Sequence, residues 1–241
     1  YLGFPYYGDE YKVMGLSPYG KPKYIEELRK IIWSGEKNIL EWDSSFFKLD
    51  KPVHKYETHR PEVAELFNVK KFESVFGKKR NIGDTLDNRH KDIASSLQRR
   101  VEELVFEILI RAHKKTGLKN LCIAGGVAQN SVANGKILQN TPFENLYIPS
   151  AGHDAGISMG AAQYYYFNDL QNKRVEPLYD ANLGISFTNI QIKQILDDKE
   201  LKYSFKEDKE LFPFVAKAIS NSGVIGFFDG KAEFGPRALG S

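Results

Sequence analysis

Two adjacent glycines at the end of an apolar run are the first residues in this chain that could support chemistry. Leu121-Cys122-Ile123-Ala124 is followed by Gly125 and Gly126, and then by a segment of helical character. That order predicts a strand, a tight turn and the start of a helix. The glycines leave no Cβ beside a ligand, and free N–H groups at a helix start favour an anion such as a phosphate. An ordinary strand-to-helix turn in an α/β core explains the same residues.

Three polar residues could complete such a site. Asn130 lies in the first turn after the glycines, where its amide could hold a nucleotide phosphate or a ribose hydroxyl, or cap the turn. Asp154 precedes a predicted helix and could bind a divalent metal that bridges nucleotide phosphates, although aspartate is also a frequent helix N-cap. His153 could be a second ligand or an acid/base group, or simply a surface histidine. The catalytic base stays unassigned.

Three charged residues are weaker candidates. Glu10 and Lys12 alternate in a mainly apolar stretch, so on a strand they would share one face, as an ion pair or as ligand contacts. Arg237 lies in a loop with glycines and a proline, where its guanidinium could hold a phosphate or carboxylate, or be solvated. The chain has no GxxxxGK[ST] phosphate loop and no GxSxG nucleophile elbow.

The elements that must position these residues follow an α/β order. Apolar residues at three- and four-residue steps predict a long helix over 90–116 with one buried face that includes Leu97, ended at Gly117. Two strand-loop-helix units come next, with strands at 121–124 and 145–148 and helices at 131–139 and 157–170. Such repetition implies parallel pairing with both loops at one sheet edge, where a ligand could contact both.

The rest of the chain has shorter signals. Residues 1–20 are typical of a structured loop with one short element. A helix over 23–33, a hairpin around Asp43-Ser44-Ser45 and a short helix at 62–67 follow. Residues 173–177 resemble a linker, beyond which we expect helices at 190–197 and 212–221 and strands at 201–205 and 224–228.

Composition limits the function classes. With 241 residues and 41% apolar content, the chain suits one large domain or two small ones. The net charge of +3, from 34 basic and 31 acidic residues, makes no strong case for nucleic acid or an anionic membrane as partner, and we expect neither. Cys122 is the only cysteine, which suits a reducing cytoplasm, and we expect it to be buried. No run of membrane-spanning length and no signal peptide is found.

Four stretches of the chain together resemble one family. They are GDEYKVMGLSPYG (8–20), GGVAQNSVANGK (125–136), PSAGHDAGISMGAA (149–162) and EFGPRALG (233–240). Their order and spacing are similar to those of the O-carbamoyltransferases of the nodulation protein U and antibiotic-tailoring (cephamycin, tobramycin) type. The last stretch is especially specific, and the resemblance covers essentially the whole chain.

The resemblance implies a two-part α/β enzyme. Residues 1–175 would be the latter part of an actin/sugar-kinase-like (ASKHA, ribonuclease H-like) transfer domain, and 176–241 the start of a YrdC-like α/β domain that forms the adenylate. Family members use carbamoyl phosphate and ATP to make carbamoyl adenylate, then pass the carbamoyl group to a hydroxyl of a sugar or other small acceptor. The cofactors implied are ATP and a divalent metal (Fe, Zn or Mg).

Site residues are carried over from the resemblance by motif. Asp154 matches the metal-binding aspartate. The candidate cofactor-binding residues are the nucleotide-contacting turn of Gly125, Gly126 and Asn130, together with Glu10, Lys12 and Arg237, whose roles in the family motifs are less firmly assigned.

Two departures from the family pattern bear on these assignments. Relatives carry a histidine-rich metal motif ahead of the place where this chain starts, and they often have two acidic residues where this chain has His153-Asp154. We therefore expect a cytoplasmic enzyme fragment that is inactive alone, with a homodimer left open. One alternative is a tRNA threonylcarbamoyl-transferase-like or sugar-kinase-like protein, but the stretch 233–240 argues against it. The other alternative is a non-catalytic nucleotide-binding or interaction module.

Overall fold

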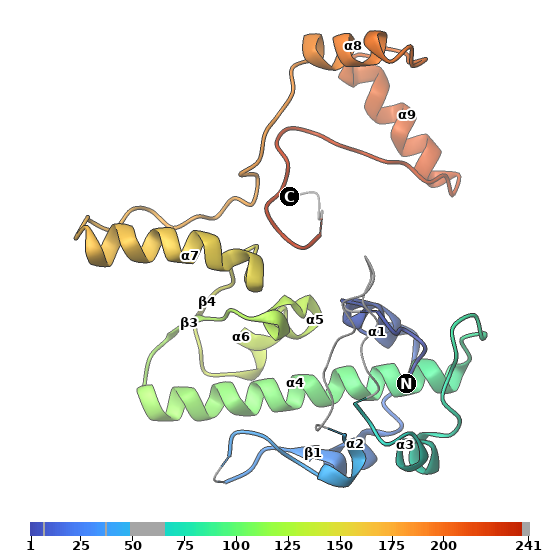
Figure 1. Cartoon of the computed structure of the whole chain (residues 1–241), viewed down its shortest axis with the longest axis vertical. Helices are drawn as coiled ribbons and strands as arrows, with labels where there is room; N and C mark the ends of the chain where they lie inside the picture. Colours follow the sequence, from blue (N-terminus) through green and yellow to red (C-terminus); the bar gives the residue numbers. More distant parts are fainter. Residues whose placement is uncertain (7, 37, 49–65, 238–241) are drawn as a thin grey trace. The chain divides into compact units, whose positions relative to one another are not determined.

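The computed structural model describes residues 1–6, 8–36, 38–48 and 66–237, and the chain divides into two compact units, Tyr1–Ile148 and Pro149–Ser241 (Figure 1). The short helix predicted at 62–67 and the end of the last motif, Gly240, fall largely or wholly outside the described residues. The domain boundary at 175/176 and the actin/sugar-kinase-like and YrdC-like assignments stay predictions.

One long helix, α4 (Asn88–Thr116), is the scaffold of the first unit (Figure 1). It begins at a capping box in which the Asp87 carboxylate accepts from the His90 N–H and the His90 ring accepts from the Asp87 N–H. It ends at Gly117, whose left-handed φ of 67° stops the helix. Its 29 residues make a rod of about 43 Å. The helix predicted over 90–116 is confirmed, although Leu97 is 38% exposed rather than buried.

The N-terminal half of α4 packs in an apolar core with α1 (Glu10–Leu16), α2 (Ile25–Ile31) and α3 (Val69–Phe76). Gly20 follows the short 3-10 turn η1 (Ser17–Tyr19) and allows the closest approach to α4, because a Cβ there would lie 2.1 Å from the Lys91 carbonyl oxygen. The core is formed by Leu2, Leu28, Ile31, Phe76, Ile93 and Ala94.

The small elements beside this core correct two predictions. Strand β1 (Ile32–Trp33) pairs antiparallel with β2 (Glu41–Trp42), so the hairpin predicted around residues 43–45 is wrong. Asp43 instead accepts a hydrogen bond from the Ser45 N–H at 2.9 Å and begins the 3-10 turn η2 (Ser44–Phe46). The helix predicted over 23–33 is confirmed for 25–31 only, because its last two residues are extended and form β1.

After α4 the chain forms a parallel pair of strands, β3 (Asn120–Cys122) and β4 (Asn145–Tyr147). Between them come the 3-10 turn η3 (Gly126–Gln129) and two short helices, α5 (Ser131–Asn134) and α6 (Ile137–Asn140). The predicted parallel pairing is confirmed, so the chain leaves both strands at the same edge.

Two details of this region differ from expectation. The helix predicted over 131–139 is interrupted at Gly135, a poor helix former, and becomes two short helices. Cys122 is exposed rather than buried, because β3 pairs with a single neighbour in the described part of the chain.

The regular elements described in the second unit are all helical. Its elements are η4 (Asp154–Gly156), α7 (Ile157–Tyr164), the π-helical turn η5 (Tyr165–Asp169), α8 (Asn189–Asp198) and α9 (Asp208–Ser220). All three helices predicted here are confirmed, and a Thr188–Gln191 capping box marks the start of α8. The strands predicted at 201–205 and 224–228 are not formed. A strand needs a hydrogen-bonded neighbour, and neither segment has a paired strand among the described residues.

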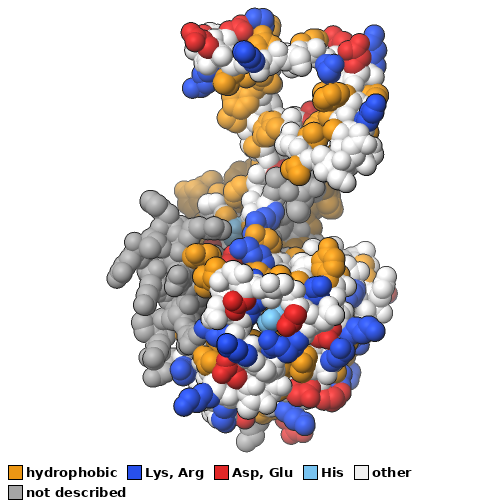
Figure 2. Space-filling view, turned by 90° about the vertical axis from the view of Figure 1, so that its right-hand side faces the viewer, with side chains coloured by type: hydrophobic (Ala, Val, Ile, Leu, Met, Phe, Trp, Pro, Cys, Tyr) orange, Lys and Arg blue, Asp and Glu red, His pale blue; other side chains and the backbone are white. Residues whose placement is uncertain are grey.

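Apolar side chains of the second unit are largely uncovered, as the upper part of Figure 2 shows. Ile190 on α8 is 81% exposed and Phe214 on α9 is 57% exposed. Ala151 is the one buried apolar residue among those described in this unit. Helix α8 therefore depends on its cap more than on a core. Across the residues that the structure describes, no helix is both long and apolar enough to cross a membrane.

Candidate functional site

The glycine turn is open to solvent. Gly125 has φ 110° and ψ 167°, which a residue with a Cβ rarely adopts, whereas Gly126 has no positive φ. A Cβ at either position would meet no atom within 4 Å. The first hydrogen bond of η3 runs from the Ala128 N–H to the Gly125 oxygen (3.0 Å), and the amides of Gly126 and Val127 donate to no carbonyl in the described ranges. The turn thus presents two adjacent N–H groups beside free space.

Asn130 anchors this turn to the next helix. Its Oδ1 accepts from the Ala133 N–H at 3.0 Å, so the capping interpretation of Asn130 is confirmed. Asn134 then donates from Nδ2 to the Ala128 carbonyl at 2.7 Å, which ties α5 back to η3. Because α5 has only four residues, the helix dipole expected to favour an anion is small here, and the free amides are the stronger feature.

A buried polar chain from α4 reaches Asn130. Gln98 and Asn130 exchange two amide hydrogen bonds, 3.1 and 3.0 Å long. Gln98 Nε2 also donates to Glu102 Oε1 at 3.1 Å, and the same oxygen accepts from the Lys136 ammonium at 2.7 Å. Glu102 is only 2% exposed. The sequence analysis missed Gln98, Glu102 and Lys136. The four-residue spacing of Gln98 and Glu102, which places both on one helix face, is the signal that could have found the first two.

Glu10 and Lys12 do not share a strand face as predicted. Both lie on helix α1, where residues two apart point in different directions. The Lys12 ammonium pairs with the buried carboxylate of Asp9 at 2.6 Å, and Glu10 is exposed in the first turn. Acidic residues at a helix start favour the helix. The structure therefore corrects the predicted ion pair.

The first two motif stretches nevertheless meet in the first unit. The Ser131 hydroxyl on α5 lies 3.9 Å from the Met14 sulfur on α1. Stretch 8–20 thus borders stretch 125–136, and both pack beside α4.

Charged groups also fix α4 to the segment before α2. The Asp92 carboxylate accepts from the Lys23 ammonium at 2.7 Å and from the Lys21 N–H at 2.8 Å, and both hydrogen bonds lower the pKa of Asp92. At the helix start, burial lowers the pKa of His90, which favours the neutral ring in the capping box. These contacts hold the scaffold under the turn.

In the second unit, Asp154 is exposed and is the first residue of η4. The alternative that Asp154 is a helix N-cap is wrong, because the cap position belongs to His153, which makes no side-chain capping bond. His153 Nδ1 is buried and has no hydrogen-bond partner among the described residues. No three His, Cys, Asp or Glu side chains in those residues lie close enough together to hold a metal ion. Asp154 and His153 therefore do not make a metal site on their own.

The third and fourth motif stretches meet in the second unit. A Cβ at Gly235 would lie 3.3 Å from the Ser150 carbonyl oxygen. The segment before Gly235 is held by backbone hydrogen bonds, from Ala232 N–H to Ile185 O (3.1 Å) and from Gly184 N–H to Ala232 O (2.9 Å). Arg237 is exposed.

The predicted site residues are thus divided between the units. The first unit holds Gly125, Gly126, Asn130, Glu10 and Lys12, and the second holds Asp154 and Arg237.

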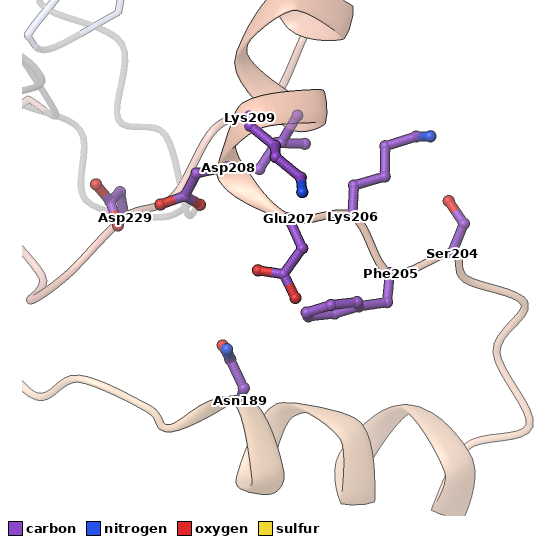
Figure 3. Close-up of a pocket in the computed structure, with 9 residues that line it drawn as sticks. Asn189, Ser204, Phe205, Lys206, Glu207, Asp208, Lys209 and Asp229 are labelled. Atoms are coloured by element: carbon purple, nitrogen blue, oxygen red, sulfur yellow. The ribbon is translucent and has the colours of Figure 1, made fainter.

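A hollow of about 840 Å³ lies between the starts of α8 and α9 (Figure 3). Figure 3 shows Phe205 and Glu207 on the side facing Asn189, while Lys206 extends away. Its lining mixes lysines with acidic residues and includes none of the residues predicted from the sequence. This composition favours no particular ligand charge, so the glycine turn remains the better candidate.

Comparison with known proteins gives a family match over the whole first unit and the start of the second. The family described as Carbamoyltransferase N-terminus matches residues 1–163.

Three relatives are similar to this chain. The uncharacterized protein sll1178 of Synechocystis sp. is 38% identical over 248 residues, which covers 100% of this chain and 38% of the relative. Nodulation protein NolO of Bradyrhizobium diazoefficiens is 33% identical over 243 residues, covering 100% of this chain and 40% of that protein. Nodulation protein U of Rhizobium fredii is 27% identical over 132 residues, covering 54% and 21% respectively. The chain thus spans less than half the length of each of these relatives.

Proposed function

This chain belongs to the carbamoyltransferase family through its match to the family's N-terminal region, and we propose that it is part of an enzyme that transfers a carbamoyl group from carbamoyl phosphate to a hydroxyl of a sugar or other small acceptor. The observation that carries the proposal is the glycine turn, which lies inside the matched residues and presents two free N–H groups beside open space. Such groups suit a phosphate.

The proposed chemistry uses ATP to form carbamoyl adenylate, a mixed anhydride. Water first displaces phosphate from carbamoyl phosphate to leave carbamate, and a carbamate oxygen then bonds to the α-phosphorus of ATP as pyrophosphate leaves. In the transfer step the acceptor oxygen bonds to the carbamoyl carbon, the bond from that carbon to the phosphate oxygen breaks, and AMP leaves with the electron pair. The acceptor proton passes to a base. The amides of Gly126 and Val127 would hold the phosphate and stabilise the charge that develops on it. The base stays unassigned.

A divalent metal (Fe, Zn or Mg) enters the proposal only through Asp154, which would be one of its ligands. Its carboxylate is exposed, and the neighbouring His153 Nδ1 has no hydrogen-bond partner in the described ranges. The described residues do not fit a complete metal site, so no reaction step is assigned to the metal. Metal content after dialysis tests this point: Asp154→Ala should lower it, whereas the control Asp169→Ala on η5 should not. Equal metal content in both variants would contradict the assignment.

The enzymatic proposal is tested with the complete gene product and labelled carbamoyl phosphate. We expect ATP-dependent release of pyrophosphate, and transfer of label to a hydroxyl-bearing sugar. Asp154→Ala should retain pyrophosphate release and lose transfer. If ATP and carbamoyl phosphate yield no pyrophosphate, the enzymatic proposal fails, and the hypothesis of a non-catalytic binding module is favoured. Label found on tRNA instead of a sugar would favour the tRNA-modifying alternative.

A further inference from the structure

The amide of Asn130 is saturated on its oxygen but not on its nitrogen. Oδ1 accepts from the Ala133 N–H (3.0 Å) and from Gln98 Nε2 (3.1 Å), which uses both lone pairs. Nδ2 donates one hydrogen to Gln98 Oε1 at 3.0 Å. Its second hydrogen has no acceptor in the part of the chain that the structure describes. Asn130 can therefore give a hydrogen bond to a ligand but cannot accept one.

Glu102, which is buried, determines which way the amides of Gln98 and Asn130 are turned. Its carboxylate is 2% exposed and pairs with the Lys136 ammonium at 2.7 Å. An ionised carboxylate only accepts, so Gln98 must turn Nε2 toward Glu102, at 3.1 Å. Gln98 Oε1 then faces the Asn130 nitrogen. The backbone imposes the same orientation on Asn130, because the Ala133 N–H can only donate and therefore requires the Asn130 oxygen to face it.

We propose that Gln98 and Glu102 are positioning residues that lock Asn130 as a hydrogen-bond donor to a phosphate oxygen at the glycine turn. This inference rests on the proposed nucleotide site. Of the two ligands open for Asn130, a phosphate oxygen only accepts and so matches the free N–H, whereas a ribose hydroxyl could meet it only by accepting, because Asn130 has no free lone pair for the hydroxyl hydrogen.

Three variants of the complete gene product test the inference by calorimetric titration with ADP and with inorganic phosphate. Glu102→Gln keeps the shape but lets residue 102 donate, so the Gln98 amide is free to flip. Asn130→Asp keeps the cap acceptor and removes the donor. Glu107→Gln is the matched control, because Glu107 lies on the same helix and makes an exposed pair with Arg111 at 2.9 Å.

We expect E102Q to weaken ADP binding about fivefold and N130D about tenfold or more, with E107Q unchanged. The double variant E102Q/N130D should bind no more weakly than N130D, because Glu102 acts through Asn130; independent structural effects would multiply instead. Weakening for both ligands would identify a phosphate oxygen as the acceptor and support the inference. Weakening for ADP alone would point to the ribose and would overturn the assignment to a phosphate oxygen.

Equal affinity of wild type and E102Q would overturn the inference and leave the proposed function standing. If E102Q does not fold, N130D decides, and wild-type affinity in N130D refutes the locked donor. Failure of the wild type to bind either ADP or phosphate would overturn the proposed nucleotide site and this inference together.

Discussion

Replacing Gly126 by alanine separates a ligand-binding turn from an ordinary one. Unlike Gly125, Gly126 has no positive φ, and an added Cβ would meet nothing within 4 Å. The new methyl group therefore creates no clash in the folded protein. Because alanine restricts the unfolded chain more than glycine does, we expect the free energy of unfolding to rise by about 0.4–1 kcal/mol.

In a phosphate-binding turn the same methyl group occupies the space that the ligand needs. A phosphate oxygen must come within about 2.9 Å of the Gly126 and Val127 nitrogens to accept their hydrogens. Losing one such charge-assisted hydrogen bond costs roughly 1.5–3 kcal/mol. ADP affinity and carbamoyl transfer should therefore fall at least about tenfold, since 1.4 kcal/mol is about a factor of ten.

The assay pairs urea unfolding with ADP titration, and Gly135→Ala is the control. Gly135 has φ −62°, and its added Cβ would lie 3.5 Å from the Ser131 oxygen, an ordinary contact. We expect the control to keep wild-type affinity. If G126A were as stable as predicted and bound ADP like the wild type, the turn would serve only the fold, and the reasoning from its free amides would be refuted.

Three further predictions concern stability and exposure. Gly125→Ala should lower the free energy of unfolding by roughly 1–3 kcal/mol, because it forces a φ of 110° on a residue with a Cβ; an unchanged urea midpoint would contradict this geometry. Asp92 has a folded pKa below its unfolded value of about 3.9, so its stabilisation is present above about pH 4 and is lost as the pH falls through the folded pKa. Asp92→Asn should therefore lower stability at pH 7 by about 1 kcal/mol and flatten the acid decline; a decline as steep as in the wild type would count against it. Exposed Cys122 should react with a thiol reagent in the folded protein, and protection until unfolding would show that it is buried.

Local signals predicted the scaffold well because they act within a few residues. The helix over 90–116 was predicted from its apolar periodicity and a stop at Gly117, and the structure retains both, whereas its cap at Asp87 was not predicted. Alternation around Glu10 and Lys12 was misleading, because an acidic helix start outweighed it. The strands predicted at 201–205 and 224–228 failed for another reason: a strand depends on a neighbour that no local pattern specifies.

The candidate site was predictable only in part. Gly125 and Gly126 stand out by residue type, and the ordinary strand-to-helix turn that explains them equally well is not separated from a ligand-binding turn by the sequence. The groups that hold Asn130 do not stand out, because Gln98 is 32 residues away in the sequence and Glu102 reaches Lys136 across 34. Such pairs form only once the strands and α4 are packed, so the four-residue spacing of Gln98 and Glu102 places both on one helix face but does not show that they meet Asn130 and Lys136.

The capping and ligand interpretations of Asn130 are not exclusive, because they use different atoms. The oxygen caps α5 and receives Gln98, while one nitrogen hydrogen remains for a ligand. Truncation to alanine would remove both functions and could not separate them. Asn130→Asp keeps the cap oxygen but deletes both amide hydrogens, including the one given to Gln98 at 3.0 Å, so the free energy of unfolding should fall by about 1 kcal/mol while phosphate affinity falls as well. Wild-type phosphate affinity beside this loss of stability would mean that the residue serves the fold alone.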